Sequence, residues 1–212
     1  MARPRLHDLD ALLDAAELLF AEGGSGALTI RALAERTGAP SGSLYHAFGS
    51  RNELLGRMWL RAANRFLDLQ RTAVSEHLGE GAGYDDDAVA ATVAAASTPA
   101  ALAAQSPATA KLLLEHRRET IVDEGLPEPL TTELQALDDQ LLQIMRTLAS
   151  ALFGRRDRRA IETVTACIVD LPTALLSSRH KRAIDPLTIL EAAVRGVLTG
   201  AASEPSSTPG RA

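Results

Sequence analysis

The chain has 212 residues, of which 22 are Lys or Arg and 27 are Asp or Glu, so its formal net charge is −5. With 46% hydrophobic and 23% charged residues it has the composition of a folded globular protein and not of a disordered chain. Aromatic residues make up only 3% and alanine is abundant, which favours helices over strands. The composition therefore predicts an all-α protein and nearly excludes an all-β fold.

The sequence gives no sign of a targeting or membrane-spanning segment. Its start, MARPRLHDLD, lacks the apolar stretch of a secretory signal, and no window approaches the ~18 uninterrupted apolar residues of a membrane helix. We therefore expect a cytoplasmic protein without membrane contact. The single cysteine, Cys167, cannot form an intrachain disulfide, and on its apolar stripe a small core residue is a simpler reading than a redox sensor.

The first fifty residues predict three helices. Apolar residues recur with the 3.6-residue period of a helix from residue 9, and the pair Gly23-Gly24 is expected to end this helix. Thr29 can cap a short second helix that Gly38 ends, and a short third helix is expected over residues 41–48.

A long helix and a loop are expected next. Ser50 and Glu53 have the spacing of a capping box, which predicts a helix to about Leu78. Residues 79–83 superficially look like a glycine-rich phosphate loop, but no strand precedes them and aspartates follow them. A flexible connection is therefore the better interpretation. Further on, Thr98-Pro99 and Ser106-Pro107 each fit an N-cap followed by proline at the first helical position, and so predict two more helix starts.

The last third of the chain is its most periodic part. Apolar residues form three helical stripes, which run through residues 130–152, 161–175 and 187–197. A loop over residues 125–129 precedes the first stripe, and Asp185-Pro186 is expected to open the final helix. The tail of residues 201–212 has nothing to bury and is expected to be disordered.

The most informative segment is TIRALAERTGAPSGSLYHAFGSRNELL, residues 29–55. It predicts a short helix with Ile30 and Leu33 inside, a turn at Gly38, and a second short helix with Leu44 and Phe48 inside. This is the layout of a helix-turn-helix, in which one face of a supported recognition helix enters the major groove, about 12 Å wide.

This segment resembles the tetracycline-repressor (TetR) family of transcriptional regulators. The matching pieces are F-x-x-x-G at residues 20–24, T-x-R-x-[LI]-A at 29–34, the Gly38 turn, and S-L-Y-x-x-F at 43–48. The resemblance covers about residues 8–58, and its pieces are specific in combination. The family often has Lys at the place of Ser41, an aromatic residue or His at that of Ala47, and Lys at that of Arg51, so the operator cannot be inferred by analogy.

The resemblance implies a domain organisation and a function. Residues 1–50 would form a three-helix DNA-binding domain, and residues 51–200 a helical ligand-sensing and dimerising domain. The protein would be a ligand-responsive regulator, most simply a repressor, that binds double-stranded, palindromic operator DNA as a homodimer. Its effector would be a small apolar or amphipathic molecule, and neither a cofactor nor a metal is expected.

The expected DNA contacts follow from the matched positions. Hydroxyls at helix N-termini and the tyrosine would contact phosphate, arginines would reach the DNA backbone, and small or polar residues would face the bases. The candidates are Thr29, Arg31, Ser41, Gly42, Ser43, Tyr45, His46 and Arg51. Residues 29–57 contain four arginines and two glutamates, a local net charge of +2, and Arg3 and Arg5 can form a minor-groove arm.

Plainer interpretations stand beside these. Tyr45 can be a core aromatic, His46 a solvated surface residue, and Arg51 an ordinary surface charge, although an arginine at a helix N-terminus is unfavourable unless something negative faces it. Glu115, His116 and Glu119 can share one helix face, but a single histidine with two carboxylates makes a poor metal site.

The stripes of the last two helices suggest a four-helix dimer interface, in which each protomer contributes the same two helices about a two-fold axis. Ordinary intrachain core is the alternative, and the family resemblance favours the dimer. The expected interface residues are Ile161, Val164, Ile168, Leu171, Leu175, Leu190, Val194 and Val197.

For the effector, large and adaptable side chains on the expected pocket walls are the candidates, although each can equally be ordinary core. They are Trp59, Phe66, Leu113, His116 and Met145. Two other functional classes stay open. A regulator whose sensor domain binds a protein, or nothing, fits the same pattern; a helical enzyme fits it less well, because no catalytic motif is present.

Overall fold

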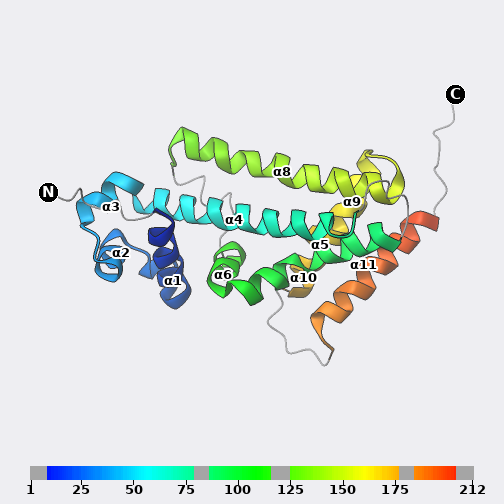
Figure 1. The fold of residues 1–212 in the computed structure, drawn as a ribbon, viewed down its shortest axis with the longest axis horizontal. Helices are drawn as coiled ribbons and strands as arrows, with labels where there is room; N and C mark the ends of the chain where they lie inside the picture. The colour runs from blue at the N-terminus through cyan, green and yellow to red at the C-terminus, as the bar shows by residue number, and fades with distance from the viewer. Residues whose placement is uncertain (1–8, 79–85, 116–124, 177–183, 204–212) are drawn as a thin grey trace. The chain divides into compact units, whose positions relative to one another are not determined.

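The computed structural model describes residues 9–78, 86–115, 125–176 and 184–203, and the regular structure within these ranges is entirely helical (Figure 1). The all-α expectation is confirmed. The elements are α1 (Leu9–Ala27), α2 (Ile30–Thr37), α3 (Ser41–Phe48), α4 (Arg51–Ser75), α5 (Asp86–Gln105), α6 (Pro107–Glu115), α8 (Glu128–Phe153), α9 (Arg158–Thr165), the π-helix η1 (Ala166–Asp170), α10 (Leu171–Leu176) and α11 (Pro186–Ser203).

The N-terminal helices begin and end close to the expected residues. The Thr29 hydroxyl accepts a hydrogen bond from the amide of Ala32 at 3.0 Å and caps α2, which Gly38 ends with a left-handed φ of 69°. α1 leaves helical geometry at Gly24, with φ 66°, and resumes for a short stretch to Ala27. Glycine tolerates both positive φ values without strain, so the predicted stops are where the chain turns.

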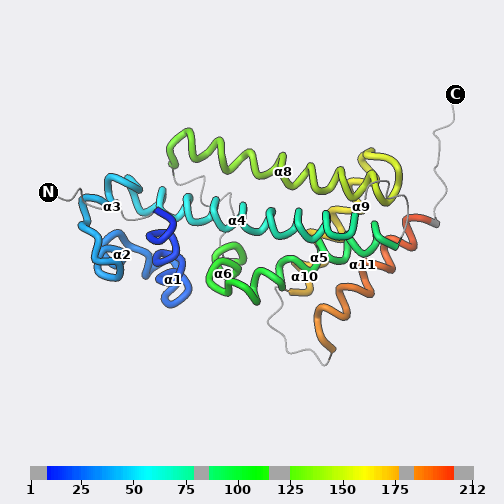
Figure 2. Tube along the Cα trace, in the orientation of Figure 1, coloured from blue at the N-terminus to red at the C-terminus, as the bar shows by residue number. Residues whose placement is uncertain are grey.

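α4 is one unbroken helix, drawn in cyan in Figure 2. At its start the Ser50 hydroxyl accepts from the amide of Glu53 at 3.0 Å, as the capping box predicts. Ser106-Pro107 opens α6 as expected, but the helix start expected at Thr98-Pro99 is wrong, because α5 runs through Pro99 without a break.

A tertiary hydrogen bond explains why α5 continues. Proline has no N–H, so the carbonyl of Ala95, one turn before Pro99, loses its helical donor. The side-chain amide of Gln70 on α4 donates to this carbonyl instead, at 3.1 Å. The backbone oxygen is thereby satisfied, and the helix does not have to end.

The stripe expected over residues 161–175 is likewise modified by a proline. Its middle is the π-helix η1, and the amide of Leu171 donates to the carbonyl of Ala166 instead of making the usual α-helical bond. Pro172 follows directly and is buried. A π-bulge widens the turn just where a proline ring would otherwise crowd the preceding carbonyl.

The final helix begins as expected, since a carboxylate oxygen of Asp185 accepts from the amide of Thr188 at 3.2 Å. α11 ends at Ser203, so the first three residues of the expected tail are helical. The rest of that tail lies outside the described residues.

The chain folds into two compact units. The first contains residues 1–66 and 102–139, and the second contains residues 67–101 and 140–212, each in its described parts. The expected domain boundary after residue 50 therefore lies inside the first unit, because the start of α4, with α6, shares a core with α1 to α3. That core contains Phe20, Leu28, Leu33, Leu44, Phe48, Leu54, Met58 and Leu112.

In the second unit, α11 contacts α9, η1 and α10. α5 is long and apolar enough to cross a membrane by length and composition, although Thr92, Ser97 and Thr98 interrupt its apolar residues. Length and composition do not distinguish a membrane span from a core helix. Ala88, Ala91, Ala95 and Ala96 of α5 are fully buried within the protein.

Candidate DNA-binding surface

α3 divides into a buried face and an exposed face. Leu44 and Phe48 are fully buried in the core of the first unit, as predicted. The expected base-facing and phosphate-facing residues of this helix are all exposed, and they are Ser41, Gly42, Ser43, Tyr45 and His46. Tyr45 is 57% exposed, so the interpretation of Tyr45 as a core aromatic is wrong. A Cβ at Gly42 would meet nothing within 4 Å, which leaves this side of the helix open to close approach.

The turn between α2 and α3 fixes how α3 is presented. The amide of Gly38 donates to the carbonyl of Ala34 at 2.9 Å, and Ala39 is buried against the core. Pro40, with φ −59°, then leads into α3. α2 and α3 are in contact, so a short, anchored turn holds the exposed face of α3 outward.

The two short helices differ at their N-termini. Thr29 caps α2 with its side chain, whereas the N-cap of α3 is Pro40, which makes no side-chain hydrogen bond. The first amides of a helix point outward and carry a partial positive charge, so an uncapped helix start favours an anion such as phosphate. Ser41 and Ser43 lie in this first turn and are exposed.

The arginines of residues 29–57 all have partners within the protein. Arg31 pairs with Glu35 at 2.9 Å, with 88% of the arginine side chain exposed. Arg36 pairs with Glu22 at 2.6 Å and Arg57 with Glu53 at 2.7 Å. Exposed pairs such as Arg31 with Glu35 contribute only about 0–1 kcal/mol, so a phosphate can compete for the arginine at small cost.

Arg51 occupies a different position from the one expected. Its guanidinium donates to the carbonyl of Leu28 at 2.8 Å and to both the carbonyl and the hydroxyl of Ser25. These neutral oxygens carry partial negative charges, and their hydrogen bonds stabilise an arginine at the start of α4. The structure therefore gives Arg51 a structural role, tying α4 to the segment between α1 and α2, and its phosphate contact stays a prediction.

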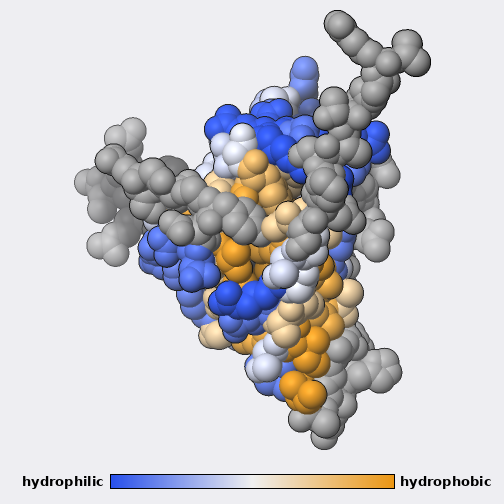
Figure 3. Space-filling model, turned by 90° about the vertical axis from the view of Figure 1, so that its right-hand side faces the viewer, coloured by the Kyte–Doolittle hydropathy of each residue, from blue (hydrophilic) through white to orange (hydrophobic). Residues whose placement is uncertain are grey.

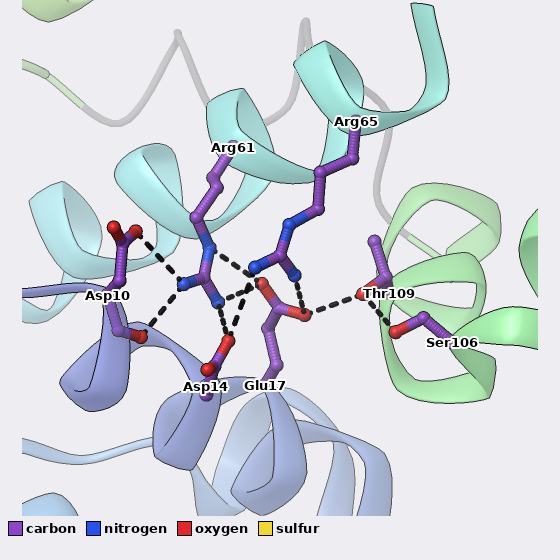
Figure 4. Close-up of polar contacts among 7 residues, drawn as sticks. All are labelled: Asp10, Asp14, Glu17, Arg61, Arg65, Ser106 and Thr109. Atoms are coloured by element: carbon purple, nitrogen blue, oxygen red, sulfur yellow. Dashed lines mark hydrogen bonds and ion pairs between the residues drawn. The ribbon is translucent and has the colours of Figure 1, made fainter. Parts of the chain in front are cut away.

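A cluster of charged side chains joins α1, α4 and α6 (Figure 4). At its centre is Glu17 of α1, whose side chain is only 4% exposed. One carboxylate oxygen accepts from Arg61 of α4, at 2.5 and 3.1 Å, and the other accepts from the hydroxyl of Thr109 of α6 at 2.6 Å. Arg61 also pairs with Asp14 at 2.8 Å and donates to the backbone carbonyl of Asp10.

The cluster contains three carboxylates, those of Asp10, Asp14 and Glu17, and two guanidinium groups, those of Arg61 and Arg65. Burial lowers the pKa of Arg61, but its hydrogen bond to Glu17 and the nearby carboxylates outweigh that effect, so the pKa lies above its usual value. Arg65 lies 3.6 Å from Glu17 and 3.4 Å from Asp14. This cluster was not predicted from the sequence. Glu17 lies on the apolar face of α1, between buried Leu13 and Phe20, and a carboxylate in that position indicates a positively charged or hydrogen-bonding partner in the core.

The described residues expected at the effector site belong to both compact units. Trp59 and Leu113 pack against the core of the first unit, and Phe66, which belongs to the same unit, is half-buried. Met145 is buried in the second unit, where its sulfur accepts from the hydroxyl of Thr165 at 3.6 Å. His116 lies outside the described residues, as does Glu119. No group of metal-binding side chains occurs among the residues that are described.

The expected dimer residues are divided between core and surface. Val164, Ile168, Leu190 and Val194 are at most 2% exposed in a single chain, so they cannot bury further area in a dimer, and their assignment to an interface is wrong. The periodicity of the sequence correctly indicated that these residues are buried, but it did not indicate that helices of the same chain cover them. Ile161, Leu171 and Leu175 are half-buried, and Val197 is exposed.

Other apolar side chains remain at the surface of the last helix. Figure 3 views the side on which α9 and α11 lie in Figure 1 and shows hydrophobic residues gathered there. Ile184, Leu187 and Val197 are the large apolar residues of this region that are exposed.

Cys167, the single cysteine, is buried in η1. Burial raises the pKa of its thiol to about 12, which fits the interpretation of Cys167 as a core residue.

Residues 12–58 match the sequence model of bacterial regulatory proteins of the tetR family. No curated protein matches the chain. The fold resembles that of a TetR-family regulator, PfmR, from Thermus thermophilus, at 19% identity and a TM-score of 0.59, covering 89% of this chain and 97% of that one.

Two other solved structures have the same fold. FadR from Bacillus subtilis, solved in complex with stearoyl-CoA, has 16% identity and a TM-score of 0.65, covering 91% of this chain and 99% of that one. The ketosteroid regulator KstR2 from Mycobacterium tuberculosis has 18% identity and a TM-score of 0.57, covering 94% and 96%. These likenesses show the fold.

Proposed function

We propose that this chain, whose residues 12–58 match the bacterial regulatory proteins of the tetR family, is a cytoplasmic, ligand-responsive repressor that binds a palindromic operator as a homodimer. The observation that carries the proposal is the exposed face of α3. Five small or polar residues lie on it around an uncapped helix start, while its apolar residues anchor the helix from behind.

In this proposal α3 enters the major groove. Tyr45, Ser43 and the first amides of α3 bind phosphate, and Ser41, Gly42 and His46 meet the base edges. Thr29 and Arg31 hold the neighbouring phosphates. Because the local positive charge is small and its arginines are paired, affinity has to come from two protomers bound to one duplex.

A second copy of the chain is the partner proposed for the apolar surface of α11. Leu187 and Val197 are exposed, Leu171 and Leu175 are half-buried, and α10 contacts α11. The same surface on a second protomer would cover these side chains about a two-fold axis. This narrower set replaces the interface expected from periodicity.

The effector is proposed to be a small apolar or amphipathic molecule bound by the ligand-sensing part of the chain that follows α3. FadR, which shares the fold, was solved with an acyl-CoA. α4 begins within three residues of the end of α3, so a tilt of α4 would move the recognition helix. The two recognition helices of a dimer would then leave the ~34–36 Å spacing of successive major grooves, through a coupling of about 1–3 kcal/mol.

Selection of bound duplexes from a random DNA pool tests this function. We expect enrichment of two inverted half-sites whose centres lie about one helical turn apart. His46→Ala should relax the choice of base at one position of each half-site, whereas His77→Ala, at an exposed histidine in the turn after α4, should leave the selected sequence unchanged. Failure to enrich any sequence would contradict the proposal.

A further inference from the structure

Gln70 of α4 is a fully buried glutamine, and only half of its amide is used. Its nitrogen donates to the carbonyl of Ala95 at 3.1 Å, within the second unit. Its oxygen, Oε1, is buried and accepts from no group in the part of the chain that is described. A buried amide oxygen without a donor is costly, and each such atom calls for a physical explanation.

Pro99 determines which end of this amide is free. The proline has no N–H, so the carbonyl of Ala95 depends on Gln70 for its hydrogen bond. Turning the amide by 180° would place Oε1 against that carbonyl, with two acceptors facing each other. The orientation is therefore fixed by chemistry: the nitrogen serves the backbone, and the oxygen is left for another donor.

The neighbours of Gln70 on its own helix are apolar, and no described group donates to its oxygen. Leu67 and Val74, one turn away on each side along α4, are buried. On α5 the hydroxyl of Thr92 donates to the carbonyl of Ala88 at 2.8 Å, within its own helix. What remains is one acceptor in an apolar setting, the pattern by which a pocket orients an apolar ligand.

We propose that Gln70 Oε1 is the polar recognition point of the effector site, and that the effector is an apolar molecule carrying a hydroxyl or N–H donor. The inference rests on the proposed ligand response and specifies its chemistry. An ether or thioester has only acceptors, so Gln70 disfavours it relative to an alcohol of the same shape.

Matched probes test the proposal on the full-length protein. Binding of 1-decanol and of decyl methyl ether is measured by thermal shift and by calorimetry. We expect the alcohol to bind about tenfold more tightly than the ether, from one buried hydrogen bond. Gln70→Met, which keeps a long side chain but lacks the amide, should remove the preference, while Thr92→Val should keep it.

Pro99→Ala gives an independent variant. It restores an N–H to the carbonyl of Ala95, which frees the Gln70 amide to turn and offer its nitrogen to the ether. The ratio of the dissociation constants of the ether and the alcohol should therefore fall toward one. Equal binding of the two probes by the wild type, binding of neither, or a preference that survives Gln70→Met would overturn the inference. The proposed function would fail in a different experiment, because the protein without ligand would then select no operator sequence from the random DNA pool.

Discussion

The buried carboxylate of Glu17 allows a stability prediction to be worked out in detail. In Glu17→Gln the amide oxygen can still accept from Arg61, and the amide nitrogen can donate to the hydroxyl of Thr109. That hydroxyl lies 2.6 Å from the hydroxyl of Ser106 and can donate to it. The hydrogen bonds are therefore kept in number, and what is lost is the negative charge.

The magnitude follows from the two bonds between Glu17 and Arg61. Removing one partner of a buried ion pair costs about 3–5 kcal/mol, and because Arg61 keeps Asp14 and its hydrogen bonds to residue 17, we expect a smaller loss of about 2 kcal/mol. For a chain of this length about 1 kcal/mol lowers Tm by roughly 2–4 °C. We therefore expect Glu17→Gln to lower Tm by about 4–8 °C in thermal unfolding followed by circular dichroism.

Glu22→Gln is the matched control on the same helix. Its carboxylate is 59% exposed and pairs with Arg36, an arrangement that contributes about 0–1 kcal/mol. We expect its Tm to stay within about 2 °C of the wild type. Equal shifts for the two variants, or no shift for Glu17→Gln, would refute the reasoning that burial makes this ion cluster structurally important.

Three further predictions concern other parts of the chain. Arg51→Ala should lower the free energy of unfolding by about 1–3 kcal/mol and flatten the salt dependence of DNA binding by about one unit per protomer; an unchanged slope would exclude its phosphate contact and leave only the structural role. Leu187→Glu should shift sedimentation from dimer to monomer with little loss of Tm, and a wild-type monomer at micromolar concentration would exclude the dimer. Burial raises the pKa of the Cys167 thiol from 9.0 to about 12, so between these pH values the thiol ionises in the unfolded chain but not in the folded one. The folded state is therefore destabilised progressively as the pH rises from 9 toward 12, by about 4 kcal/mol in all. Wild type should therefore lose more stability than Cys167→Ala between pH 8.5 and 10.5 in urea unfolding, and parallel losses would contradict this.

The parts of the fold that sequence predicted well depend on local signals. Thr29 and Ser50 cap their helices and Gly38 ends one, because each acts on amides or dihedrals within a few residues of itself. The exposed face of α3 follows in the same way from the spacing of Leu44 and Phe48. These features needed no knowledge of distant parts of the chain.

The errors concern partners far away in sequence. Arg51 binds oxygens more than twenty residues away, and Pro99 stays inside a helix because Gln70 replaces its missing donor. Val164 and Ile168 were recognised as buried, but periodicity does not say whether the covering surface belongs to the same chain. Spacing along a helix reports burial, whereas assignment of a partner needs the tertiary structure.

The salt dependence of operator binding tests the central claim most directly. A selected duplex is titrated with wild type, Arg31→Ala and Arg158→Ala by fluorescence anisotropy at several salt concentrations. Arg31 and Arg158 are matched, because each is almost fully exposed and pairs with a glutamate four residues later. The account predicts a steep fall of affinity with salt for the wild type, and a slope lower by about one unit per protomer for Arg31→Ala only. Binding that does not depend on salt, or equal effects of the two variants, would contradict the assignment of α2 and α3 as the DNA-binding surface.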